Sequence, residues 1–74
     1  MTVKPHEFPE GDIVRISHLY ATTRLLPEAH RFIDQVGIIT KRYLDFEGHI
    51  AVIQFHNGRL RLNLERSGDL IEKL

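Results

Sequence analysis

Two runs of alternating apolar and polar residues, one on each side of Asn57-Gly58, constrain the fold of this chain most strongly. A type I′ turn needs positive φ at both central residues, and Asn followed by Gly adopts it at the least cost. A shift of one residue would exchange the apolar and polar faces, so the alternation restricts the register. The sequence therefore predicts a β-hairpin over residues 50–64, with its turn at Asn57-Gly58.

This turn fixes which residues oppose each other. The expected pairs on the apolar side are Phe55 with Leu60, Ile53 with Leu62 and Ala51 with Leu64. The expected pairs on the polar side are His56 with Arg59, Gln54 with Arg61 and Val52 with Asn63. One face of the hairpin would then be buried, and the other would meet solvent or a partner.

Size and composition restrict the class of protein. Seventy-four residues are enough for one domain, and the absence of cysteine excludes disulfides and thiolate metal sites. No stretch approaches the roughly 18 apolar residues of a membrane span, and the amino terminus has no apolar signal-like segment. The formal net charge is zero, whereas nonspecific nucleic-acid binders usually carry a basic excess. We expect a cytoplasmic protein that does not bind membranes and is a monomer.

The chain before the hairpin begins with a segment that has little periodicity. Residues 1–10 contain two prolines and predict a flexible leader, which leaves residues 11–74 as the folded domain. A β-branched run over residues 13–17 predicts the first strand, with Val14 and Ile16 on its buried face.

Residues 18–35 form a long connection that contains no glycine. Pro27 suits the first turn of a helix, and Ala29, Phe32 and Ile33 have the spacing of one apolar helical stripe. Two interpretations remain open: a short helix over residues 27–33, or an extended loop with Phe32 in the core. An ordered loop of this length in a small domain is often functional.

The remaining segments complete a set of five strands. They are residues 36–43 as the second strand, 44–49 as a hairpin loop, 65–68 as a turn or one turn of 3₁₀ helix, and 69–74 as the last strand. Gly37 near the start of the second strand indicates a close approach of the backbone or a bend. The predicted fold is mainly β, a small closed barrel of five strands with a long first loop.

A family resemblance follows from the glycine and strand motifs. Gly11-Asp12-Ile13-Val14-Arg15-Ile16, Gly37-Ile38-Ile39, residues 52–58 and Leu70-Ile71-Glu72 together resemble an SH3-like barrel. Within that fold the chain is similar to KOW-type domains, to accessory subunits of electron-transport complexes, and to small bacteriophage proteins. The resemblance implies the fold over residues 11–74. It does not fix one function, because many functions share this fold.

Catalytic and metal-binding motifs are missing from the sequence. The five histidines have none of the spacings of zinc ligands, and no nucleophile, base and orienting residue stand in a known arrangement. We therefore expect no cofactor, no metal and no enzymatic activity.

The functional expectation is a non-catalytic interaction module, comparable to a phage-encoded accessory protein. It would dock on a larger protein or assembly through the long loop and the polar face of the hairpin. The predicted partner-binding residues are Tyr20, Arg24, Arg31, Tyr43, Gln54, His56, Arg59 and Arg61. The alternative is a KOW-like domain associated with nucleic acid, transcription or the ribosome, whose phosphate contacts would be Lys41, Arg42, Arg59 and Arg61.

Overall fold

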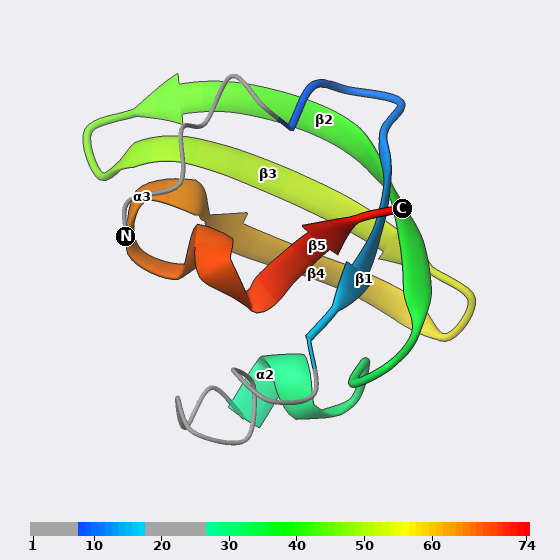
Figure 1. Ribbon diagram of the computed structural model, residues 1–74. Coiled ribbons are helices and arrows are strands. Elements are labelled where there is room, and N and C mark those ends of the chain that lie inside the picture. The colour runs from blue at the N-terminus through cyan, green and yellow to red at the C-terminus, as the bar shows by residue number, and fades with distance from the viewer. Residues whose placement is uncertain (1–7, 18–26) are drawn as a thin grey trace.

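The computed structural model describes residues 8–17 and 27–74 of the chain. Its fold is mainly β and consists of one antiparallel sheet of five strands (Figure 1). The elements are β1 (Ile13–Ile16), α2 (Pro27–His30), β2 (Val36–Asp45), β3 (Gly48–Phe55), β4 (Gly58–Asn63), α3 (Leu64–Ser67), the 3₁₀ helix η2 (Gly68–Leu70) and β5 (Ile71–Lys73). None of the helices in this part of the chain is long and apolar enough to cross a membrane.

The sheet has the strand order β4-β3-β2-β1-β5, and β4 and β5 are its two edges. The closed barrel expected from the sequence is therefore not formed by the strand pairings. The two edge strands are joined by the chain segment that forms α3 and η2, and β4 and β5 are not paired with each other. Leu64 and Leu70 of this connection are buried, so side chains from α3 and η2 contribute to the core between the edges.

The hairpin of β3 and β4 exists, but its predicted register is wrong by two residues. Phe55 pairs with Gly58 and Ile53 pairs with Leu60, so the turn consists of His56 and Asn57. Asn57 does not have a positive φ, which excludes the expected type I′ turn, whereas Gly58 has φ +150°. A shift of two residues leaves every side chain on its predicted face.

The hairpin of β2 and β3 repeats this arrangement. Asp45 pairs with Gly48 across the two-residue turn Phe46-Glu47, and Gly48 has φ +128°. The Asp45 carboxylate accepts a hydrogen bond of 2.8 Å from the Glu47 backbone N–H, as in an Asx turn. Both hairpins thus place a glycine directly after a two-residue turn.

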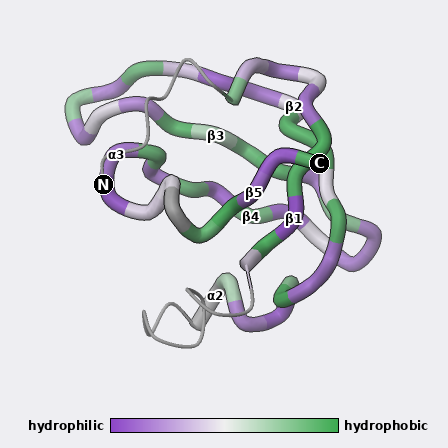
Figure 2. The backbone as a smooth tube through the Cα atoms, in the orientation of Figure 1, coloured by the Kyte–Doolittle hydropathy of each residue, from purple (hydrophilic) through white to green (hydrophobic). Residues whose placement is uncertain are grey.

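The core lies on the inner face of the sheet, where each strand contributes alternate residues. Figure 2 shows hydrophobic and hydrophilic residues interleaved along the strands. Val14, Ile16, Ile53 and Leu62 are buried as predicted. The remaining buried apolar residues of this core are Phe8, Ala29, Phe32, Ile39, Ala51, Phe55, Leu60, Leu64, Leu70 and Ile71.

The part of the long connection that the structure describes begins with a helix of four residues, α2. Ala29 and Phe32 are buried, and the Phe32 ring stacks on Phe55 with 4.4 Å between the ring centroids. The chain then joins the sheet, because the Asp34 N–H donates to the Ile16 carbonyl at 3.2 Å. The helical interpretation is confirmed over Pro27–His30, and Phe32 also reaches the core as the loop interpretation required.

Strand β2 has one residue without a counterpart on β3. Ile39 pairs with Ile53 and Lys41 pairs with Val52, so Thr40 forms a β-bulge. Before the bulge Ile39 faces the core, and after it Arg42 does, opposite Ala51. The bulge bends the strand and reverses which of its residues face inward.

Arg42 attaches the segment before β1 to the sheet. Its guanidinium donates to the Phe8 carbonyl through Nη1 and to the Ile50 carbonyl at 3.2 Å through Nε. Its backbone N–H donates to the Glu10 carboxylate at 2.8 Å, and Phe8 is buried. Phe8 therefore packs against the edge of the core. Residues 1–7 of the predicted leader lie outside the described part of the chain.

Candidate functional site

The outer face of the sheet, opposite the core, is the surface on which the candidate functional residues lie. Directly paired residues on neighbouring strands share a face, so the register arranges this surface in rows. The rows are Arg59-Gln54-Ile38-Ile13, Arg61-Val52-Lys41, and Asn63 and Tyr43 on either side of the fully buried Ile50, with Val36, Arg15 and Glu72 beside Ile13 and Ile38. Side chains from all five strands therefore gather on one surface.

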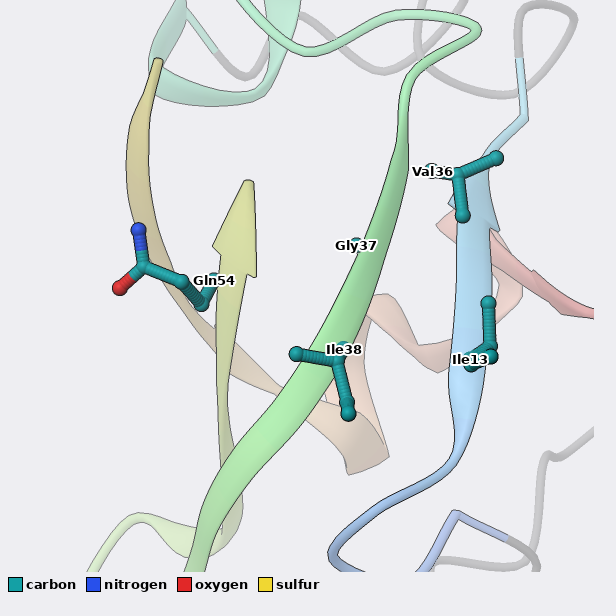
Figure 3. A pocket seen from close by; sticks show the side chains of 5 residues that line it. All are labelled: Ile13, Val36, Gly37, Ile38 and Gln54. Carbon is teal, nitrogen blue, oxygen red and sulfur yellow. The ribbon is translucent and has the colours of Figure 1, made fainter. Parts of the chain in front are cut away.

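An apolar hollow lies at the end of this face where β2 begins. Ile13, Val36 and Ile38 are 52%, 51% and 42% exposed, although all three are β-branched aliphatic residues. Together with Gly37 and Gln54 they line a shallow, open depression of about 260 Å³. Figure 3 shows their side chains arising from β1, β2 and β3.

The backbone at Gly37 brings the hollow close to the core. A Cβ atom on Gly37 would lie 2.7 Å from both Ile53 Cγ2 and Phe55 Cε1, on the inner face. The close approach expected at this glycine is confirmed. The two residues that flank it, Val36 and Ile38, consequently point to the outer face and form the wall of the hollow.

Charged side chains stand beside the hollow. The guanidinium of Arg59 has no hydrogen bond or ion pair with any residue of the described part of the chain, and Arg59 is exposed next to Gln54. Arg15 lies 3.4 Å from the Glu72 carboxylate, with both side chains nearly half exposed. Lys41 lies with its ammonium 5.5 Å from the centre of the Tyr43 ring. The hollow thus has cations on the sides formed by β1 and β4.

A second cluster lies near the other end of the outer face. Arg61 donates to the Tyr43 hydroxyl at 2.9 Å and to the Asp45 carboxylate at 3.0 Å. The hydrogen bond to Tyr43 raises the pKa of the Arg61 guanidinium, and the charges of Glu47 and Asp45 act in the same direction. This cluster therefore presents a guanidinium that is already bound to a carboxylate.

The hairpin residues of the predicted site are only partly brought together. Gln54 opposes Arg59 and not Arg61, and its amide donates to the carbonyls of Phe55 and Gly58 at 2.8 and 3.2 Å. His56 lies exposed in the turn and does not oppose Arg59. The predicted polar face is therefore correct in its members on the strands, but their pairing is different.

The long-loop residues of the predicted site divide into two groups. Arg31 is exposed, donates to the Asn57 carbonyl at 3.4 Å and lies with its guanidinium 5.5 Å from the centre of the Phe32 ring. It therefore lies beside the turn of the β3–β4 hairpin. Tyr20 and Arg24 lie outside the described residues.

The four cations named for phosphate binding do not form one surface. Arg42 is directed to the inner side and binds backbone carbonyls, and Arg61 is bound by Asp45. Lys41 and Arg59 remain on the outer face, on β2 and β4, with β3 between them. Phosphate recognition would have to rely on these two separated side chains.

Sequence reasoning missed two features of the surface. One is the apolar hollow. The sequence indicated it through the adjacent apolar pairs Ile13-Val14 and Ile38-Ile39, because one residue of each pair faces the core and the other faces outward. The other is Phe46, which is 97% exposed in the turn between β2 and β3. The sequence indicated it by placing an aromatic residue in the predicted hairpin loop over residues 44–49.

Within the part of the chain that the structure describes, no group of three histidine, aspartate or glutamate residues is arranged to hold a metal ion. Comparisons of the chain with protein-family models, curated proteins and solved structures found no match.

Proposed function

We propose that the protein is a non-catalytic interaction module that docks on a protein partner through the outer face of its sheet. The hollow of Ile13, Val36 and Ile38 would form the centre of the contact, and Gln54 and Arg59 would form part of its rim. The long connection and the β3–β4 turn, beside which Arg31 lies, would extend the contact at one side.

One observation carries this proposal: three branched aliphatic side chains are contiguous and about half exposed on adjacent strands. Single exposed apolar residues are ordinary on protein surfaces, whereas contiguous apolar patches with polar rims mark binding sites. An apolar centre with a polar rim is also the usual anatomy of a protein–protein interface. Burial of this patch would supply the main part of the binding free energy.

The fold proposed with this function is an SH3-like sheet left open between its edges. Its support is the strand order, in which the last strand pairs with the first, and the 3₁₀ helix directly before β5. The likeness to KOW-type domains and to small phage proteins remains a hypothesis on the motifs alone.

The test compares three immobilised proteins: the wild type, Ile38→Glu in the hollow and Leu44→Glu as a control. Leu44 is an exposed aliphatic residue near the other end of β2 and does not line the hollow, so the control adds the same charge elsewhere. From an extract of the native host, we expect a protein to be retained by the wild type and by L44E but lost from I38E. Equal retention by all three would refute the outer face as the docking surface.

A salt titration separates this function from phosphate binding. Binding through apolar burial changes little as salt rises, whereas binding to RNA or DNA falls steeply. Binding of RNA or DNA that weakens steeply with salt, and that is lost in a Lys41→Ala and Arg59→Ala double variant but kept in I38E, would favour the nucleic-acid alternative.

A further inference from the structure

Two exposed apolar features lie at opposite ends of the same strand. The hollow is formed where β2 begins, around Val36 and Ile38, and Phe46 follows directly after β2 ends at Asp45. Eight residues separate Ile38 from Phe46, a distance of roughly 20–25 Å along a curved strand. Phe46 therefore cannot enter the hollow of its own molecule.

Phe46 is free to serve as the apolar anchor of a contact. Its side chain is 97% exposed at the tip of the longest hairpin, where it contributes nothing to the core. A phenylalanine placed in an apolar site removes about 150–250 Å² from water, which makes it an effective anchor for a contact. The tip is flanked by carboxylates, which makes insertion into an anionic lipid surface unfavourable.

The charges around the two features are opposite in sign. Beside Phe46, the exposed Glu47 has no side-chain bond within the described part of the chain, whereas Asp45 is held by Arg61. Beside the hollow, Arg59 has no partner among the same residues. A carboxylate next to the apolar tip and a guanidinium next to the apolar hollow are complementary.

We propose that the occupant of the hollow is Phe46 of a second copy of this chain. The proposal rests on the proposed function, because it uses the same outer face as the docking surface. Glu47 of the inserted hairpin pairs with Arg59 beside the hollow. In this proposal each molecule offers its tip to one neighbour and its hollow to another, so the contact is head to tail and joins more than two copies.

Such a contact is weak. A tip of one aromatic residue in a shallow hollow buries far less than the roughly 1,000 Å² of a stable interface. The chain is therefore a monomer when dilute, and its apparent mass rises with concentration beyond that of a dimer. Analytical ultracentrifugation of the wild type over a wide range of concentrations measures this rise.

The decisive experiment mixes two variants, each of which has lost one half of the contact. Phe46→Ala removes the tip and keeps the hollow, whereas Ile38→Glu destroys the hollow and keeps the tip. Each variant alone is expected to stay monomeric, and the equimolar mixture is expected to form one heterodimer that does not grow. NMR spectra of labelled F46A, titrated with unlabelled I38E, should shift at Ile13, Val36 and Ile38.

Charge reversal supplies an independent readout. Glu47→Arg and Arg59→Glu should each weaken the association about two- to fivefold, the effect of one exposed ion pair. The double variant carries the reversed pair and should recover the affinity of the wild type.

Three outcomes overturn the proposal: a wild type that is monomeric at every concentration, association that persists in F46A or I38E alone, or variants whose mixture remains monomeric. If the wild type does not associate and I38E still loses a protein of the host extract, the proposed function stands and the head-to-tail contact is refuted. Far-UV circular dichroism of each variant establishes that it is folded.

Discussion

The rings of Phe32 and Phe55 stack with their planes 14° apart and their centroids 4.4 Å apart, which joins the segment after α2 to strand β3. Phe32 is 2% exposed, so it belongs to the core although it lies outside the strands. Gly58 lies at the edge of the same ring, because a Cβ there would be 3.3 Å from Phe32 Cζ. One aromatic contact thus holds the long connection against the β3–β4 hairpin.

Phe32→Ala should reduce the free energy of unfolding by about 3–5 kcal/mol, because it removes a buried ring and leaves a cavity. Urea denaturation followed by circular dichroism measures the loss. Phe46→Ala is the matched control and should change stability by less than about 0.5 kcal/mol, because Phe46 is exposed. Similar losses in both variants would contradict the role of Phe32.

Gly37→Ala should destabilise the protein by about 1–3 kcal/mol, because the added methyl group has no space between Ile53 and Phe55. Gly11→Ala is the control for the loss of a glycine, because no atom lies within 4 Å of its added methyl group. Gly11 has φ +94°, so that variant reports backbone strain without crowding. A stable Gly37→Ala protein with unchanged thermal unfolding would show that the strand is not packed as described.

Gly58→Val should cost about 1 kcal/mol or more, because valine is strained at φ +150°. Asn57→Ala should be nearly neutral, because Asn57 does not have a positive φ in the observed turn. A type I′ turn at Asn57-Gly58 would instead make both substitutions costly. Thermal unfolding of the two single variants distinguishes the two turns.

Arg42→Met should destabilise the protein by about 1–3 kcal/mol, because the carbonyls of Phe8 and Ile50 lose a charged donor. Lys41→Met is the control, since Lys41 is exposed on the other face. When Arg42→Met is combined with Phe8→Ala, the loss of unfolding free energy should be smaller than the sum of the two single losses, because both substitutions release the same segment. Additive losses would mean that Arg42 does not hold that segment.

The faces of the strands could be predicted from the sequence, but the register of the hairpin could not. Alternation reports which side of the sheet a residue faces, and a shift by two residues leaves that unchanged. Only the turn distinguishes the two registers, and Asn-Gly suits a type I′ turn so well that the prediction followed local preference. The same arrangement at Phe46-Glu47-Gly48 was a second example within the chain, from which the position of Gly58 after the turn could be inferred.

The hollow and the closure of the sheet depend on contacts between distant segments. Ile13 and Ile38 become neighbours only because β1 pairs with β2 in one register. The open edge arises because residues 64–70 form α3 and η2, where the sequence indicated a turn or one turn of 3₁₀ helix over residues 65–68. The members of the predicted site on β3 and β4 were found because their exposure follows from alternation alone.

The bulge at Thr40 divides β2 into two parts that differ in which positions face the core. Gly37 and Ile39, at odd positions before the bulge, are buried, whereas directly after it Lys41 faces outward and Arg42, at an even position, is directed inward. If Thr40 instead paired with Val52, alternation would continue without interruption, Lys41 would oppose Ala51 and turn toward the core, and Arg42 would be carried away from the carbonyl of Phe8. Thr40, although exposed itself, thereby determines which neighbouring residues of β2 face solvent and which face the core.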